Sequence, residues 1–424
     1  MGILRPLPPR PAPVHIAILT NEYPPHVYGG AGVHVEYLAR ELARLDGGAH
    51  RVDVLAFGDQ AVDDGALRVR GVGALGGAAP PDGRHGKLFD ALGRDLAMAG
   101  RVSADADVVH AHTWYAHLAG CLAAPLAGAR LVLTTHSLEP HRPWKREQLG
   151  TAYDVSSWIE RTAYASADGV IAVSDSMRAD VEALYDTGGA AVDVIPNGID
   201  PDEYRPTRQP DVLREWGVDP DRPYVLFVGR VTRQKGIVHL VRALRHLPAD
   251  TQVVLAAGAP DTPEIAAEMA AAVEAARAHT PDVVWIEQML PREAAIALYG
   301  EAAVFVCPSV YEPFGIINLE AMACETAVVA SAVGGIPGIV VDGETGVLVP
   351  LDADDDSAEP RDADRFARDV AAAISDLLAH PARAEAMGRA GRARVVEHFS
   401  WAAVARRTLA FYQRLVEAPP RPAR

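Results

Sequence analysis

The stretch YVLFVGRVTRQKGIVHLV, residues 224–241, carries the pattern from which the fold follows. It opens with a continuous apolar run of β-branched and aromatic residues, which is typical of a strand buried on both faces. A glycine and a polar loop come next, and a helix is expected to begin at Gly236. A strand, a loop and a helix in this order form the repeating unit of an α/β fold.

The same unit recurs in two series along the chain. The apolar runs of the first series are 14–20, 51–57, 107–112, 130–136 and 168–174, and those of the second are 224–229, 252–258, 282–287, 303–309 and 326–331. The proline-punctuated stretch 195–210 separates the two series and is the expected linker. We therefore predict two doubly wound, Rossmann-like domains, residues 14–205 and 206–399, with the ends of their sheets facing each other. The cleft between such domains is the expected ligand site, because ligands bind outside the carboxyl ends of the strands.

Length and composition exclude several classes of protein. The chain has 424 residues, and a domain commonly has roughly 100–200, so two full domains are expected. With 49% apolar and 23% charged residues, it has the composition of an ordinary globular protein. A net charge of −16 opposes broad contact with nucleic acid or anionic lipid. An anionic ligand must therefore be held by a local cationic pocket.

Cysteine usage and the first residues indicate the compartment. Cys121, Cys307 and Cys324 show neither metal-ligand spacing nor a disulfide framework, which favours a reducing compartment. The N-terminal stretch MGILRPLPPRPAP has prolines where a secretory signal has its apolar core, and no apolar run reaches ~18 residues. We expect a cytoplasmic protein that has no membrane partner.

Two cations lie in the loop after the run 224–229. Arg230 and Lys235 lie on one strand-to-helix loop, and such a pair suits adjacent phosphates. The start of the following helix adds its own positive end. Lys235 is one of only three lysines among 40 basic residues, so its retention points to a role that arginine does not fill.

A second cluster lies in PSVYEPFGIINLEAMA, residues 308–323. Glu312 precedes a predicted helix, and Glu320 lies inside it with apolar neighbours, where an unpaired carboxylate would be costly. Ligand hydroxyls are suitable partners for both carboxylates. The N–H groups of Phe314, Gly315 and Ile316 at the helix start offer an anion site. With the cation loop, this cluster predicts a site for a sugar and a diphosphate.

Glycines and histidines at strand ends in the first half add further candidates. Gly29 and Gly30 precede a helix and allow close approach to an anion, although their spacing is not that of a dinucleotide fingerprint. His136 ends a predicted strand, and its position favours a role at the site. Three other histidines are expected to be satisfied polar residues: His110, His112 and His117. No His/Asp cluster implies a metal, and we expect neither a metal nor a cofactor.

These motifs resemble the retaining glycosyltransferases of family 4. The pairs Gly229-Arg230 and Lys235-Gly236, and Glu312 and Glu320 with seven residues between them, are similar to that family's donor-site signatures. The blocks that resemble the narrower actinobacterial-type glycogen synthase group, which includes α-maltose-1-phosphate synthases, are NEYPPHVYGGAGVHVEYLA, HAHTWYAHLAG, THSLEPHRPWKREQLG, SSWIERTA and PSVYEPFGIINLEAMA. The resemblance extends from about residue 14 to residue 415.

The resemblance implies the two-domain GT-B fold, with a last helix, residues 400–417, that crosses back to the N-terminal, acceptor-side domain. It implies that Arg230 and Lys235 bind the donor diphosphate and stabilise the leaving group. By the same resemblance, Glu312 holds the donor glucose and Glu320 the ribose. The remaining implied contacts are Gly29 and Gly30 near the diphosphate or the acceptor, His136 beside the transferred glucose, and Asn197 in the cleft.

The acceptor side departs from the family pattern. Polymer-extending bacterial synthases resemble Lys-x-Gly-Gly and His-Asp-Trp where this chain has Val27-Tyr28-Gly29-Gly30 and His112-Thr113-Trp114. A lysine and an acceptor-side carboxylate are therefore missing. With basic residues in the loop 142–146, the loss of a negative charge favours an anionic acceptor, although such cations also occur on solvated loops. The expected acceptor contacts are Tyr28, Thr113, Trp114, Arg142 and Lys145.

The implied reaction is transfer of glucose from ADP-glucose to glucose 1-phosphate, with retention at the anomeric carbon, to form α-maltose 1-phosphate. The runner-up is a glycogen synthase that extends an α-1,4-glucan from ADP-glucose or UDP-glucose. A transferase of another sugar such as mannose comes third, and a catalytically silent sensor of nucleotide sugars is the alternative from another class. The base of the donor and the oligomeric state, a homo-oligomer included, are left open.

Overall fold

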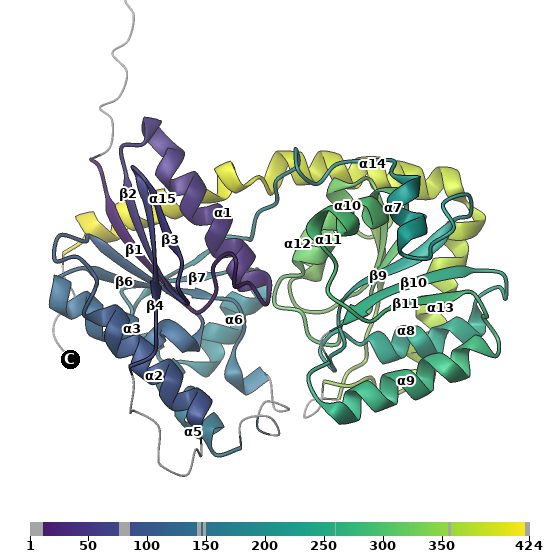
Figure 1. Ribbon diagram of the computed structural model, residues 1–424, viewed down its shortest axis with the longest axis horizontal. Coiled ribbons are helices and arrows are strands. Elements are labelled where there is room, and N and C mark those ends of the chain that lie inside the picture. The colour runs from purple at the N-terminus through teal and green to yellow at the C-terminus, as the bar shows by residue number, and fades with distance from the viewer. Residues whose placement is uncertain are drawn as a thin grey trace, which may run out of the picture.

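Two β-sheets organise the chain, each in its own lobe (Figure 1). The computed structural model describes residues 12–75, 85–141, 146, 150–258, 260–354 and 358–419. Within these ranges the first lobe holds a sheet in the order β3-β4-β2-β1-β5-β6-β7-β8. Its strands are β1 (His15–Thr20), β2 (Arg51–Phe57), β3 (Ala61–Asp64), β4 (Leu67–Val72), β5 (Val108–His112), β6 (Arg130–Thr135), β7 (Gly169–Ala172) and β8 (Ala191–Val194).

Helices cover both faces of this first sheet, as its continuous apolar strands require. Ile16 and Ile18 of β1 pack into a core with α1 and α15, whereas Ala17 and Leu19 pack into the core on the opposite face, which includes α3. Alternate residues of one strand therefore anchor two helical layers. The helices of this lobe are α1 (Gly30–Arg44), α2 (Gly86–Ala99), α3 (Trp114–Ala127), α5 (Ala152–Ser166) and α6 (Asp175–Leu184), with 3₁₀ turns at Leu45–Gly47 and Glu139–His141.

The second lobe contains a parallel sheet in the order β11-β10-β9-β12-β13-β14. Its strands are β9 (Tyr224–Arg230), β10 (Gln252–Gly258), β11 (Val283–Ile286), β12 (Val304–Cys307), β13 (Ala327–Ser331) and β14 (Gly346–Val349). Its helices are α7 (Pro210–Glu215), α8 (Ile237–Ala243), α9 (Pro263–Arg277), α10 (Arg292–Glu301), α11 (Ile316–Ala323), α12 (Ile336–Ile339), α13 (Ala363–Ala379) and α14 (Pro381–His398), with a 3₁₀ turn at Leu244–His246. Because β9 and β12 are neighbours, the loops that follow them lie side by side at one sheet edge.

The C-terminal helix α15 (Trp401–Glu417) returns to the first lobe, as expected, and Figure 1 shows α14 and α15 running along both lobes. Phe411 and Leu415 lie so close to Gly169 of β7 that a Cβ there would lie 2.6 Å from the Leu415 side chain. The hydroxyl of Tyr412 lies 2.6 Å from Nδ1 of His110 on β5. The last helix therefore completes the core of the first domain.

The first sheet is mixed rather than wholly parallel, which differs from the prediction. β3 runs antiparallel to β4 at one edge, while the other described pairs in this sheet are parallel. All four residues of β3 are exposed, and its sequence AVDD contains no apolar run that would mark it as a buried strand. Gly65 turns the chain between β3 and β4 at φ 63°. β8 is also a half-exposed edge strand. Among the described residues, no helix is long and apolar enough to cross a lipid bilayer.

Two helical glycines predict opposite effects of the same substitution. A Cβ on Gly388 of α14 would lie 1.8 Å from the carbonyl oxygen of Glu325, in the turn after α11, whereas the nearest atom to a Cβ on Gly93 of α2 would lie at an ordinary 3.5 Å. We expect Gly388→Ala to lower the free energy of unfolding by ~1–3 kcal/mol through overpacking. The control Gly93→Ala should raise it by up to ~1 kcal/mol, because alanine restricts the unfolded chain. Urea unfolding of both variants tests this, and an unchanged midpoint for Gly388→Ala contradicts it.

Candidate active site

A buried ion pair joins the loops after β9 and β12. The Nζ of Lys235 lies 2.6 Å from Oε2 of Glu312, and the hydroxyl of Ser309 donates to the same oxygen at 3.2 Å. Glu312 is only 5% exposed, so its carboxylate depends on these two donors. Gly236 makes the pairing possible, because it adopts φ +59° and a Cβ there would lie 2.0 Å from the carbonyl oxygen of Pro308.

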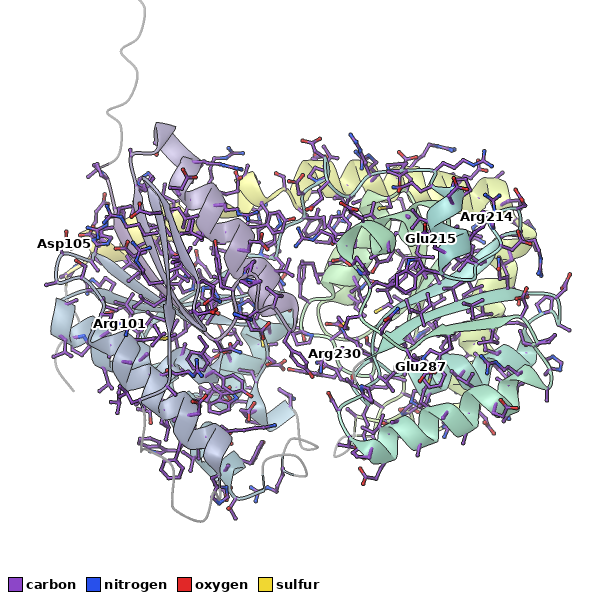
Figure 2. The ribbon with its side chains drawn as sticks, in the orientation of Figure 1. Arg101, Asp105, Arg214, Glu215, Arg230 and Glu287 are labelled. Atoms are coloured by element: carbon purple, nitrogen blue, oxygen red, sulfur yellow. The ribbon has the colours of Figure 1, made fainter. Side chains whose placement is uncertain are left out.

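The other predicted cation, Arg230, bridges the two lobes. Its Nη1 donates to Oδ1 of Asp261 at 2.9 Å and to the hydroxyl of Tyr28 at 2.8 Å. The guanidinium carbon also lies 4.7 Å from the centroid of the Tyr28 ring, which is a cation–π distance. Figure 2 shows Arg230 where the lobes meet. The structure thus brings a predicted acceptor residue and a predicted donor residue into contact, and it adds Asp261, which no sequence motif singled out.

Glu320, inside α11, is held by two tyrosines. The hydroxyl of Tyr299 donates to Oε2 at 2.9 Å, and that of Tyr204 donates to Oε1 at 3.2 Å. Burial raises the pKa of Glu320 to about 7, and the two hydroxyl bonds partly offset this rise. The sequence predicted hydroxyl partners from a ligand, whereas the structure supplies hydroxyls from Tyr204 in the linker and Tyr299 in α10.

The start of α11 faces the glycine loop of the first lobe. Gly315 adopts φ 101° and caps the helix, and no side chain among the described residues caps it. Phe314 is buried and Ile316 is half-buried. A Cβ on Gly30 would lie 3.8 Å from the Ile316 side chain, so Gly30 lies beside the predicted anion site.

The glycine loop already holds a carboxylate of its own chain. Oε2 of Glu22 accepts hydrogen bonds from the N–H groups of Tyr28 at 2.8 Å and Gly29 at 2.7 Å. The N–H of Gly29, which the sequence assigned to a bound ligand, is therefore engaged by Glu22 in this structure. The amides of Gly30 and Ala31 lie in the first turn of α1, where no intrahelical acceptor is available. These two amides are the better candidates for a bound anion.

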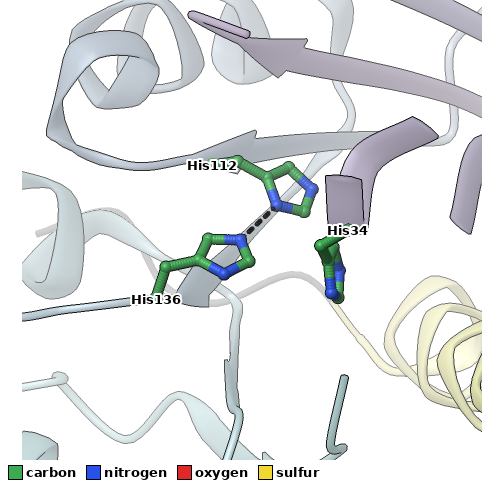
Figure 3. A group of neighbouring side chains, drawn as sticks. All are labelled: His34, His112 and His136. Atoms are coloured by element: carbon green, nitrogen blue, oxygen red, sulfur yellow. Dashed lines mark hydrogen bonds between the residues drawn. The ribbon is translucent and has the colours of Figure 1, made fainter. Parts of the chain in front are cut away.

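Three histidines from three separate segments meet beside this cleft (Figure 3). His112 ends β5, His136 follows β6, and His34 lies inside α1. Nδ1 of His112 and Nε2 of His136 are 3.0 Å apart, while Nδ1 of His34 lies 2.6 Å from Oδ1 of Asn197. Burial lowers the pKa of all three rings, so they are neutral at neutral pH. Asn197, assigned to the cleft, thus positions His34, which the sequence did not predict.

The sequence predicts that His110, His112 and His117 are satisfied polar residues. This prediction is right for His110 and wrong for His117. Both ring nitrogens of His110 have partners, the hydroxyls of Tyr412 and Thr134. Both ring nitrogens of His117 are buried without a partner in the described part of the chain, so His117 is not a satisfied polar residue. Its ring contacts Tyr164 edge-on instead, in an apolar environment that lowers its pKa to about 3. For His112, Nδ1 is paired and Nε2 is not.

The predicted acceptor residues fall into three groups. Tyr28 lies on Arg230, and Thr113 donates a hydrogen bond to Asn21 at 2.8 Å, beside the start of the glycine loop. Trp114 is buried in an apolar cluster and stacks on Tyr115, so it packs within the domain instead of facing the cleft. The remaining two, Arg142 and Lys145, lie outside the described residues.

Comparison with known proteins gives the family. The Glycosyltransferase Family 4 model matches residues 28–203, and the Glycosyl transferases group 1 model matches residues 209–394. An α-maltose-1-phosphate synthase of Mycolicibacterium smegmatis is 50% identical over 95% of this chain and 100% of that protein. The chain belongs to glycosyltransferase family 4. A glycogen synthase of Mycobacterium tuberculosis is 30% identical to this glycosyltransferase over 94% of each chain.

Solved structures confirm the two-lobed GT-B fold of this glycosyltransferase. A sucrose-phosphate synthase from Thermosynechococcus elongatus superposes with a TM-score of 0.73 at 26% identity, and the match covers 95% of this chain and 99% of that one. Because the match covers nearly the whole of both chains, it includes both lobes.

The Lys235–Glu312 pair predicts a non-additive effect on the stability of this glycosyltransferase. Lys235→Met leaves a buried carboxylate without its cation and should lower the free energy of unfolding by ~3–5 kcal/mol. The double variant Lys235→Met/Glu312→Gln should recover part of that loss, because no unpaired charge remains. As a control, Arg214→Met removes an exposed ion pair with Asp211 and should cost less than ~1 kcal/mol. Urea unfolding measures all three, and a double variant no more stable than the single one contradicts the prediction.

Glu320 predicts a pH-dependent term in the stability of the enzyme. Its pKa is raised from an ordinary 4.5 to about 7, so between these values the folded chain binds a proton that the unfolded chain has lost. The contribution of Glu320 to the free energy of unfolding therefore falls as pH rises through this window. Glu320→Gln lacks the term and should gain stability relative to the native chain as pH rises. Thermal melts of both proteins across this range test it, and a constant difference argues against the raised pKa.

Proposed function

We propose that this glycosyltransferase transfers glucose from ADP-glucose to glucose 1-phosphate and releases α-maltose 1-phosphate. The observation that carries the proposal is the 50% identity to an α-maltose-1-phosphate synthase, which extends over nearly the whole chain and the whole relative. The 30% identity to a glycogen synthase makes glucan elongation the second candidate.

The donor diphosphate binds, in this proposal, between the cation loop and the start of α11. Lys235 has three N–H groups, so it can keep Glu312 on one and donate the others to phosphate oxygens. Arg230 is held by Asp261 and Tyr28 through Nη1, which leaves its other nitrogens to donate. Because each cation already carries a carboxylate partner, directed hydrogen bonds contribute more to phosphate binding than net charge does.

The same groups stabilise the transition state. As the bond between the sugar and the phosphate breaks, negative charge develops on the leaving ADP. Arg230, Lys235 and the α11 amides stabilise this charge. Glu312 is engaged by Lys235 and Ser309, and Glu320 by two tyrosines. Neither carboxylate is presented as a nucleophile of the kind a double-displacement glycosidase uses. Attack on the same face as the leaving group, with its phosphate accepting the acceptor's proton, accounts for retention.

The remaining roles concern the two sugars. In the proposed complex, Glu312 accepts hydrogen bonds from the donor glucose hydroxyls, Glu320 accepts them from the ribose, and His136 contacts the transferred glucose. The acceptor phosphate is assigned to Arg142 and Lys145 on the charge argument from the sequence, and the acceptor sugar to Tyr28 and Thr113. The absence of an aspartate at Thr113 removes a charge that would repel this phosphate.

The deciding experiment offers the purified chain ADP-glucose or UDP-glucose together with either glucose 1-phosphate or glycogen. Nucleotide release is followed, and the product is identified by ¹H and ³¹P NMR. A phosphorylated disaccharide with an α-1,4 link from ADP-glucose supports the proposal. Elongation of glycogen without use of glucose 1-phosphate would contradict the proposed reaction and support a glucan synthase. No turnover of either donor would support a nucleotide-sugar sensor.

The acceptor assignment predicts a selective kinetic effect. Replacing Arg142 and Lys145 with glutamine should raise the KM for glucose 1-phosphate much more than the KM for the donor, because only the acceptor phosphate loses its cations. The control Arg101→Gln removes an arginine of the same lobe that Figure 2 shows far from Arg230, and it should leave both constants unchanged. An unchanged acceptor KM in the double variant rules out the loop as the phosphate site.

A further inference from the structure

The three-histidine group, His34, His112 and His136, contains a lone pair that nothing in the described structure satisfies. Oδ1 of Asn197 can only accept, so Nδ1 of His34 carries the proton of that ring and donates it. Nε2 of His34 is then an unprotonated acceptor. It is buried and has no hydrogen-bond partner among the described residues. A buried polar atom left without a partner is costly and calls for an explanation.

The other two rings are hydrogen-bonded to each other through Nδ1 of His112 and Nε2 of His136, and a single proton serves this contact. A change of tautomer in the donor ring leaves both of these nitrogens as acceptors. His34 lies 2% exposed, with its ring edge-on to His136 at 4.8 Å between centroids, so the rings are in direct contact. A cation can accept the lone pair of Nε2 of His34, which no hydrogen-bond donor of the described structure reaches.

The spacing of the nitrogens suits such a cation. One ring nitrogen from each histidine lies within 4.8 Å of the others, and the pair from His112 and His136 is 3.0 Å apart. At zinc–nitrogen distances of ~2.0–2.1 Å, two ligands on a tetrahedral ion lie about 3.3 Å apart. Two of the nitrogens therefore already have nearly the required separation, and the third needs an approach of about 1.5 Å.

The surroundings resemble those of a metal site in two further respects. A ligating histidine usually donates its second nitrogen to an oxygen acceptor that fixes its tautomer, and Asn197 does this for His34. His34 and His112 are buried while His136 is half-buried, so His136 is the most accessible of the three. The ligand set contains imidazoles alone, which suits Zn²⁺, Co²⁺, Ni²⁺ or Cu²⁺ and disfavours Mg²⁺ and Ca²⁺.

We propose that His34, His112 and His136 bind one divalent transition-metal ion of the zinc type, with its open coordination position facing the cleft. The ion and the donor glucose then exclude each other, because both occupy the space beside His136. This exclusion rests on the proposed function, which places the transferred glucose there, whereas the metal site itself does not. Zinc-type ions are thus reversible inhibitors that compete with the nucleotide sugar.

Co²⁺ titration of the metal-free chain tests the site without any sugar substrate. Visible absorption bands of a four-coordinate ion should saturate at one Co²⁺ per chain, and excess Mg²⁺ should not remove them. His34→Asn should abolish the bands, and Asn197→Ala should weaken binding by about 10–100-fold because His34 loses its orienting partner. His380→Asn, at an exposed helix end beside Asp376, is the control that keeps the native signal. Native Co²⁺ binding in His34→Asn overturns the proposal.

Two measurements use the native chain, so they test the proposal even if a variant fails to fold. X-ray absorption of the Zn²⁺-loaded protein should show three imidazole ligands, and two or fewer overturns the site. ADP-glucose should then displace Co²⁺ from the native protein, and Co²⁺ that stays bound at saturating ADP-glucose overturns the exclusion. Failure of the product assay would refute the proposed reaction. It would not affect the test of the metal site, because Co²⁺ binding and X-ray absorption are measured without a sugar substrate.

Discussion

The pairing of Lys235 with Glu312 is the constraint on which the second half of the site depends. A carboxylate buried to this degree needs a cation and a further donor, and Ser309 supplies the second. To bring the lysine there, the chain must turn sharply at Gly236, against the carbonyl of Pro308. The adjacency of β9 and β12 places the two loops within reach of each other. Sheet order, one left-handed glycine and one ion pair thus define a single arrangement, in which α8 and α11 both begin at the cleft.

Several of the contacts that join the lobes are polar. Arg230 reaches Tyr28, Arg292 of α10 reaches Tyr37 of α1 at 3.1 Å, and the hydroxyl of Ser174 donates to the carbonyl of Pro313 at 2.8 Å. Polar interfaces of this type within a chain resemble transient ones, so relative movement of the lobes is the natural expectation. Such movement would carry the donor groups towards and away from the glycine loop, and closure would exclude water from the reacting atoms.

Much of this architecture can be predicted from sequence, and the parts that cannot have identifiable reasons. Strands such as β9 and β12 are apolar throughout because helices cover both faces, so their pattern stands out. β3 is exposed at every residue and has no such pattern. Arg230, Lys235 and Glu312 could be found because they lie at the end of a strand or in the loop after it. Asp261, Glu22 and His34 could not, because they come from other segments and meet the site only through tertiary packing.

The return of α15 to the first domain has a consequence for how the chain folds during synthesis. The core between β1, α1 and α15 lacks Trp401, Phe411 and Tyr412 until the second domain has been made, because α15 follows that domain in the sequence. Backbone hydrogen bonds between Ile199 and residues 399–401 also hold the segment where the chain returns to the first domain. Domains commonly fold in the order in which they are made. Here the domain made second can complete its sheet first, while the domain made first waits for the last helix and exposes apolar surface that a chaperone would recognise.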